Sequence, residues 1–443
     1  MEGAEILERL QHYHSDEAQH LEYAEKARAA LARLELTKTK IPLPADVIPL
    51  TVKPKTAGKR WHPPKDMLDL IELRHDLHRH PEISGEEKET ARRVRAFLEQ
   101  APPDRLLAGL GGHGVAAVYD SGRSGPSVLI RSEIDALPIR EKGEVEYRSS
   151  VDGKGHLCGH DGHSTILTAL ALGLARQRPE TGRVILLFQP AEETGAGAAA
   201  VIADPRFAEI KPDYSFSLHN LPGLPFGHVS VVEGPVNCAS RGIKITLAGK
   251  TAHASSPEHG ISPMRAIARL MPSLSDLGSG FPPAPDFSMV TITHAIMGEA
   301  AFGISPADAE IWATLRTLTD DRMENLCNAA ETLAKRVADE EGLTLDITYD
   351  DIFLHCENAP DAVDHIRQAL DDEKISHGSE GLPMRASEDF GRFRGVSSSA
   401  MFFLGAGRDY PNLHNPDYDF PDALIGIGAR IFMRLIRNLT DGK

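Results

Sequence analysis

The order in which strand and helix patterns follow one another limits the possible folds of this 443-residue chain more than any other feature. Over residues 66–238, short apolar strands alternate with helices, as in a largely parallel sheet with helices on both faces. Over 239–352 the order becomes βαββαβ, which is the order of the ferredoxin-like fold. The first pattern resumes over 353–443. We therefore predict one α/β domain, in two sequence segments, that is split by an inserted α+β domain.

The predicted elements have approximate bounds that follow from hydrophobic periodicity. In the α/β domain they are helices 67–80, 88–99, 164–178, 360–373 and 421–438, and strands 128–131, 184–188, 214–218 and 400–404. In the inserted domain they are strands 240–248, 287–293, 309–318 and 343–349, and helices 262–277 and 321–341. Residues 1–65 read as an appendage, with a helix over 3–35 followed by a proline-rich linker.

The charge of the chain argues against several kinds of partner. The formal net charge is −16, whereas a nucleic-acid-binding protein needs a basic face. The longest apolar stretch, Thr165 to Ala175, is far short of the ~20 residues that span a bilayer. Four scattered cysteines do not form a disulfide framework, and the polar N-terminus does not resemble a signal peptide. We expect a cytoplasmic protein that binds neither nucleic acid nor membranes.

Six side chains with metal-binding groups lie next to predicted elements of the α/β domain. They are Cys158 and His160 before helix 164–178, Glu192 and Glu193 after strand 184–188, His219 after strand 214–218, and His414 after strand 400–404. Because ligands of open α/β sheets bind at the carboxyl ends of the strands, we expect these groups to gather at one edge. A metal hydrolase needs ligands and one further carboxylate to activate water. The adjacent Glu192 and Glu193 can divide these two tasks.

Several short segments, in the same order along the chain, resemble the co-catalytic metal peptidase family that holds aminoacylases and carboxypeptidases. The resemblance is strongest to the branch of hippurate hydrolase and the indole-acetyl-amino-acid amidohydrolases, and it covers about residues 66–440. The matching segments are RHDLHRHPE (74–82), IDALP (134–138), CGHDGH (158–163), LLFQPAEETGAGA (186–198), FSLHN (216–220), GKTAHASSPEHGISP (249–263), ATLRT (313–317), ASEDF (386–390) and LHNPD (413–417).

The resemblance implies a role for each matched residue. The implied metal ligands are Cys158, His160, Glu193, His219 and His414, with Cys158 shared between two metals. Glu192 matches the catalytic base. His253, in the inserted domain, matches a histidine that reaches the active site of a partner subunit. The family dimerises through this domain, so we expect a homodimer or a larger oligomer.

The same segments indicate which metal and which neighbouring groups to expect. A cysteine ligand suits zinc and a carboxylate-rich site suits manganese, so we expect one or two Zn²⁺ or Mn²⁺ ions per subunit. Asp135 and Asp161 are expected to orient the imidazoles of the metal ligands. Asp161 has a second interpretation, as an acidic residue at a helix N-terminus.

The substrate is expected to be a small anion. Arg316 matches an arginine that faces the substrate's carboxylate, and Glu388 is a further candidate for substrate binding. Two positions depart from the family pattern. Glu133 stands where an aspartate is usual, and Gly303 stands where the family has an asparagine that helps to hold the substrate. Because glycine replaces asparagine at position 303, the sequence leaves the identity of the substrate open.

Three functions follow from these residues. The first is hydrolysis of the amide of an N-acyl or N-aroyl amino acid, with Glu192 as the general base. The second keeps the same chemistry but replaces the amine of an activated (nitro)aromatic carboxylate with hydroxyl, which releases ammonia. The third is a binding protein without catalysis, which the complete set of ligands and Glu192 disfavour.

Overall fold

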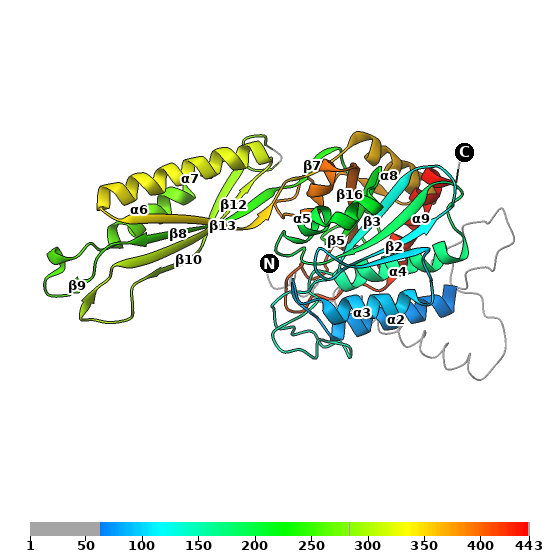
Figure 1. Cartoon of the computed structure of the whole chain (residues 1–443), viewed down its shortest axis with the longest axis horizontal. Helices are drawn as coiled ribbons and strands as arrows, with labels where there is room; N and C mark the ends of the chain where they lie inside the picture. Colours follow the sequence, from blue (N-terminus) through cyan, green and yellow to red (C-terminus); the bar gives the residue numbers. More distant parts are fainter. Residues whose placement is uncertain (1–62, 283, 442–443) are drawn as a thin grey trace, which may run out of the picture. The chain divides into compact units, whose positions relative to one another are not determined.

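The computed structural model describes residues 63–282 and 284–441 (Figure 1). The predicted helix over 3–35 and almost all of the proline-rich linker lie outside the described residues. None of the described helices is long and apolar enough to cross a membrane.

The larger sheet of the described chain has eight strands in the order β1-β2-β4-β3-β5-β16-β6-β15. Its strands are β1 (Arg105–Leu110), β2 (Gly114–Asp120), β3 (Ser127–Glu133), β4 (Arg183–Gln189), β5 (Tyr214–Pro222), β6 (Val229–Ser230), β15 (His377–Gly378) and β16 (Ser398–Gly407). The central strands β4, β3, β5 and β16 are parallel. β1 and β2 extend one edge in antiparallel fashion. The predicted mostly parallel sheet is confirmed, although the sequence did not reveal β1 and β2.

Helices cover both faces of this sheet, as predicted. One layer contains α2 (Pro63–Arg79), α3 (Lys88–Leu98), α4 (His160–Arg176), α8 (Pro360–Glu373) and α9 (Ala423–Thr440). The other contains α5 (Gly197–Ala203) and the 3₁₀ helices η1 (Pro205–Ile210) and η3 (Asp389–Gly395). Alternate residues of β4 join the two cores, since Leu186 packs with the first layer whereas Ile185 and Leu187 pack with the second. This burial on both faces explains the continuous apolar run of β4.

The inserted segment forms its own antiparallel sheet in the order β10-β12-β8-β13. Its strands are β8 (Ala239–Ala248), β10 (Ser288–Met297), β12 (Asp308–Thr317) and β13 (Thr344–Phe353), and its helices are α6 (Met264–Ser275) and α7 (Asp320–Glu341). Both helices pack on one face and share a separate hydrophobic core (Figure 1). This is the predicted βαββαβ order with the strand arrangement of the ferredoxin-like fold. A short ribbon of β9 (Ala252–His253) and β11 (Ile304–Ser305) also belongs to this segment.

Three predicted boundaries were wrong at places that matter for the site. α4 begins at His160 rather than at residue 164, because its first turn consists of buried polar residues that give no hydrophobic signal. β5 continues to Pro222, so His219 lies inside a strand and not in a loop. β16 continues to Gly407, which shortens the loop before His414.

Candidate metal centre

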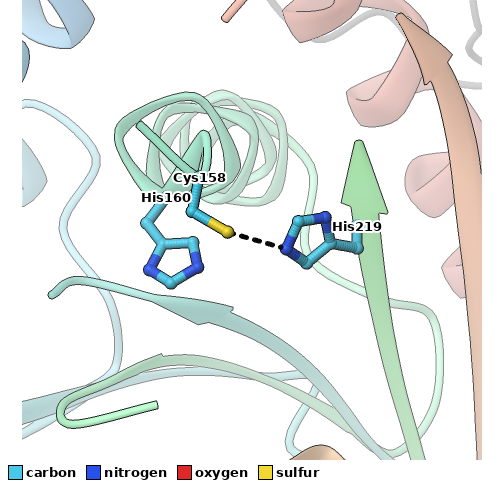
Figure 2. Close-up of side chains that lie close together, drawn as sticks. All are labelled: Cys158, His160 and His219. Carbon is cyan, nitrogen blue, oxygen red and sulfur yellow. Dashed lines mark hydrogen bonds between the residues drawn. The ribbon is translucent and has the colours of Figure 1, made fainter. Parts of the chain in front are cut away.

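A tight turn at the start of α4 brings Cys158 and His160 together. Gly159, between them, has φ +94°, a conformation that residues with a Cβ rarely adopt. A Cβ at this position would lie 2.2 Å from the side-chain oxygen of Asn220, so the turn also requires the absence of a side chain. Figure 2 shows the two side chains at the start of α4 with His219 on β5 beside them. The Sγ of Cys158 lies 3.4 Å from Nε2 of His219.

The hydrogen bonds of the imidazoles of His160 and His219 fix which nitrogen of each ring faces the cluster. Nδ1 of His160 donates to the carbonyl oxygen of Asp135 at 2.9 Å and lies 3.3 Å from a carboxylate oxygen of the same residue. Nδ1 of His219 donates to the carbonyl oxygen of Asn220 at 2.8 Å. Each Nε2 therefore remains available as a metal ligand, in the arrangement that metal-binding histidines commonly show.

The two adjacent glutamates approach the same imidazole. Nε2 of His160 lies 3.9 Å from a carboxylate oxygen of Glu192 and 3.8 Å from one of Glu193. The same oxygen of Glu193 lies 3.6 Å from Nε2 of His414. His414 itself, at φ +65°, donates its backbone N–H to the carbonyl oxygen of Leu157 at 2.8 Å. The groups expected at the carboxyl edge of the sheet are thus brought together.

The ligand atoms form overlapping groups in which all atoms lie within 4.8 Å of one another. One group is Cys158, His160 and His219, another is Cys158, Glu193 and His414, and a third is His160, Glu192 and Glu193. Cys158 belongs to two of these groups, so it could be shared between two ions. Glu192 belongs to neither group that contains Cys158.

These residues fit a divalent metal ion. Nε2 of His160 and a carboxylate oxygen of Glu193 are buried and have no hydrogen-bond partner within the described part of the chain. A buried polar atom without a partner costs about 1–3 kcal/mol, and coordination to a metal would remove that cost. One thiol, three imidazoles and a carboxylate form a donor set that suits zinc and, through the carboxylate, manganese.

Four groups at the metal-free cluster have raised pKa values, whereas burial lowers the pKa of His219 to about 3 and also lowers that of His414. Burial, reinforced by the neighbouring carboxylates, raises the pKa of the Cys158 thiol well above its usual range. Burial also raises the pKa of Glu193 to about 7. Burial opposes the charged form of His160, but its bond to Asp135 and the nearby carboxylates raise its pKa to about 10. Glu192, surrounded by Glu388, Glu193 and Asp389, is likewise raised in pKa, with burial as the largest cause.

Two residues expected at the active site lie together on the inserted segment. His253 is in β9, where it pairs with Ile304 of β11, and its Nδ1 contacts the hydroxyl of Ser255. The neighbouring N–H of Ala254 donates to the carbonyl oxygen of Gly303 at 3.0 Å. His253 is exposed and joins none of the metal-capable groups found among the described residues. A Cβ at Gly303 would meet nothing within 4 Å, so this position is open.

The other two predicted substrate contacts lie near the segment that follows Arg385. Nη1 of Arg316 donates to the carbonyl oxygen of Arg385 at 3.0 Å and to the hydroxyl of Ser387 at 2.8 Å. Glu388 is buried, with a carboxylate oxygen within 4.8 Å of those of Glu192 and Asp389. Arg316 therefore bonds to Ser387, the residue next to Glu388, and the carboxylate of Glu388 lies close to that of Glu192.

The structure corrects the expected role of Asp161. Its carboxylate does not orient a ligand imidazole but lies 2.8 Å from Nδ1 of His78 and 3.1 Å from Nε of Arg74. Both partners belong to α2, so Asp161 joins the first turn of α4 to that helix. Asp135, by contrast, contacts His160 as expected and also accepts the backbone N–H of Glu193 at 2.9 Å.

Two groups at the site were missed or underrated by the sequence analysis. The guanidinium of Arg131 is fully buried and pairs with Glu133, Glu388 and Asp389. Nδ1 of His163 lies 2.6 Å from Glu133, and its Nε2 lies 2.5 Å from the side-chain oxygen of Asn220. Both nitrogens of His163 are thus occupied, although the ring is close to a metal-capable group. The motif CGHDGH gave a signal for His163, whereas nothing in the local sequence revealed the ion pairs of Arg131.

Comparison with known proteins supports the resemblance. The model of peptidase family M20/M25/M40 matches residues 129–438. Hippurate hydrolase of Campylobacter jejuni is 30% identical over 84% of this chain and 97% of its own length, and N-acetylcysteine deacetylase of Bacillus subtilis is 34% identical over 61% and 70%. Among solved structures, the YXEP protein of Bacillus subtilis, described as a dinuclear metal binding peptidase, is 26% identical, with a TM-score of 0.71, over 85% of this chain and 99% of the matched one.

Binding of a metal to the metal-free protein should release protons at pH 7. Cys158 and His160 carry protons there because their pKa values are raised, and a metal binds only their deprotonated forms. Affinity should accordingly weaken as the pH falls from about 8 to 6. Calorimetric titration with Zn²⁺ in two buffers of different ionisation enthalpy measures the release. Heats that do not depend on the buffer would contradict the assignment, and Cys158→Ala should release fewer protons than the wild type.

Proposed function

Because the chain belongs to peptidase family M20/M25/M40 and is a metal-dependent amidohydrolase, we propose that it cleaves the amide of a small N-acyl or N-aroyl amino acid. Hippurate and N-acetylcysteine, which give two relatives their names, are both small N-acyl amino acids. The observation that carries the proposal is the position of Glu192, a buried carboxylate beside a metal-capable cluster but outside both groups that share Cys158.

We propose that five residues hold the metal. They are Cys158, His160, Glu193, His219 and His414, with Cys158 shared if two ions bind. Zinc fits the thiol and the imidazoles, and manganese fits the carboxylate. When bound, the metal polarises the scissile carbonyl group and lowers the pKa of water towards about 7.

In this proposal Glu192 moves the proton. Its carboxylate accepts a proton from the attacking water and later gives that proton to the leaving nitrogen. Burial and the neighbouring carboxylates raise the pKa of Glu192, which makes its carboxylate a stronger base for the proton of the attacking water. The backbone N–H of Asp389, 3.4 Å from a carboxylate oxygen of Glu192, helps to fix the orientation of the side chain.

Replacement of Glu192 by glutamine separates metal binding from catalysis. Glu192→Gln should retain the metal and lower kcat by about 10²–10⁴-fold, because the amide has nearly the same shape but cannot accept the proton. Glu193→Gln is the matched control on the neighbouring residue, and it should lower bound metal and activity together. Metal analysis and steady-state kinetics on both variants test the assignment. Near-normal turnover by Glu192→Gln would show that another group is the base.

The substrate's carboxylate is proposed to bind Arg316. The two hydrogen bonds that Arg316 makes to Arg385 and Ser387 use only Nη1, so Nε and Nη2 take part in neither bond. Such a planar fork suits a carboxylate. The open space at Gly303 changes the pocket relative to the family pattern, but the named relatives give no support to deamination of an aromatic amine. We therefore propose amide hydrolysis alone.

Removal of this guanidinium should weaken substrate binding. Arg316→Ala should raise KM for a hippurate-like amide by roughly 10- to 30-fold, which corresponds to about 2 kcal/mol of lost charge-assisted bonding. The effect should shrink for the amide analogue of the substrate that lacks the carboxylate. Equal KM values for the variant and the wild type would remove Arg316 from the site. Release of ammonia from an aminobenzoate, with no hydrolysis of amides, would overturn the proposed reaction.

We propose that the inserted segment joins two copies of the chain. β10 is an edge strand of the four-stranded sheet, and its second half is exposed. Large apolar side chains are exposed in this half of β10 and nearby. Ile296 is 51% exposed, Met297 is 39% exposed, and Phe302 is fully exposed. An unpaired apolar edge is a liability in a monomer and suits pairing with a second strand. In such a dimer, the exposed His253 would complete the site of the partner subunit.

Mixed dimers test the shared site. His253→Ala and Glu192→Gln chains should each be nearly inactive, whereas a mixture that has exchanged subunits should regain about a quarter of wild-type activity. Half of the dimers would be hybrids, and each hybrid would contain one complete site. A double variant, His253→Ala with Glu192→Gln, mixed with either single variant is the control and should restore nothing. Proven hybrids without activity would show that His253 does not act on the partner's site.

We also propose that the enzyme works in the cytoplasm. All four cysteines are free and buried, and none is paired as a disulfide. Such usage is typical of proteins from reducing compartments. Fractionation of cells that produce the protein, followed by an activity assay, would test this location.

A further inference from the structure

The residue immediately before Glu192 and Glu193 has an unusual backbone. Ala191 has φ +51°, in the left-handed region that residues with a Cβ seldom occupy. This conformation turns the chain sharply after β4 and presents two consecutive carboxylates to the cluster. Because the turn is intrinsically unfavourable for alanine, the surrounding structure must hold it in place.

Two buried carboxylates hold the turn from behind. The N–H of Ala191 donates to a carboxylate oxygen of Glu87 at 2.8 Å, and the N–H of Glu193 donates to Asp135 at 2.9 Å. Glu87 is fully buried, and the same oxygen accepts the N–H of Gly85 at 2.8 Å. A side chain more than 100 positions earlier in the chain thus anchors the residue that precedes the proposed base.

Glu87 does not serve the helix at whose start it stands. It is the N-cap residue of α3, but its side chain makes no capping bond there. The first turn of α3 is served instead by Glu82, whose carboxylate accepts both the N–H and the hydroxyl of Thr90. The other carboxylate oxygen of Glu87 is buried and has no partner among the described groups. A costly buried carboxylate that does not cap its own helix is expected to have another task.

We propose that Glu87 is a positioning residue, which holds Ala191 in its left-handed conformation and thereby aims Glu192 and Glu193 at the substrate and the metal. This inference rests on the proposed function, because that function assigns the roles of Glu192 and Glu193. Asp135 fixes the far end of the same turn, so Glu87 and Asp135 together limit its rotation. Groups that orient metal ligands commonly change metal affinity or activity by about 10–100-fold when they are removed.

Three variants separate positioning from general stability. Glu87→Met removes the acceptor while keeping the length of the side chain, and it should lower both kcat and metal affinity by about 10–100-fold with little change in KM. Glu87→Gln keeps an amide oxygen for the N–H of Ala191 and should retain most of both properties. Glu82→Met is the matched control, since it removes the half-buried carboxylate that accepts from Thr90 in the same segment. It should lower the melting temperature without lowering kcat in the folded protein.

A second change tests whether the effect passes through Ala191. Glycine adopts positive φ without the penalty of a Cβ, so Ala191→Gly should be nearly neutral alone and should recover part of the activity lost in Glu87→Met. The proposal fails if Glu87→Met, like Glu82→Met, loses only thermal stability. It also fails if Ala191→Gly restores none of the activity that Glu87→Met loses.

Hydrogen exchange gives a readout that does not depend on catalysis. In the metal-free wild type, the amide of Ala191 should exchange slowly, and this protection should be lost in Glu87→Met and kept in Glu87→Gln. Rapid exchange of this amide in the wild type would overturn the proposal even if Glu87→Met does not fold. If the protein hydrolyses no amide at all, exchange and Zn²⁺ affinity still decide the role of Glu87, so the two proposals can fail separately.

Discussion

The buried guanidinium of Arg131 makes the acidic interior of this site possible. It pairs with Glu133, Glu388 and Asp389, all of which are almost completely buried. A buried carboxylate without a partner would take up a proton or destabilise the fold. Because Arg131 lies at the end of a central strand, its ion pairs also join the sheet to the segment that carries Glu388 and Asp389. Glu192 can therefore sit among carboxylates within a folded protein.

The metal-capable cluster is built on this charged edge from rigid pieces of secondary structure. His219 lies within β5, His160 begins α4, and Glu193 follows β4 after the turn at Ala191. Hydrogen bonds to Nδ1 orient the rings of His160 and His219. These three candidate ligands are thus held by other parts of the chain, which is how protein sites fix the geometry of a metal ion.

The sequence predicted the central fold and the candidate ligands, because both depend on local patterns. Apolar runs marked the buried parallel strands, and the rule that ligands gather at the carboxyl ends of such strands placed Glu193, His219 and His414 together. β1 and β2 were missed because a glycine-rich turn, Gly109 to Gly114, interrupts their pattern. The buried polar first turn of α4 hid its true start.

Contacts between distant segments could not be predicted in this way. Asp161 had two plausible roles from its position in the sequence, and only the packing of α2 against α4 showed that it pairs with Arg74 and His78. Glu87 is the N-cap residue of α3, yet its side chain accepts the N–H of Ala191 rather than one from that helix. In both cases the side chain has several possible local partners, and tertiary packing selects among them.

X-ray absorption spectroscopy of the zinc-loaded protein would test the central claim, that the metal lies among Cys158 and the histidines, most directly. The account predicts a sulfur neighbour at about 2.3 Å and nitrogen or oxygen neighbours at about 2.0–2.1 Å. The sulfur signal should disappear in Cys158→Ala and persist in Cys238→Ala, a buried cysteine outside the metal-capable groups. A wild-type zinc site with nitrogen and oxygen neighbours only would contradict the account.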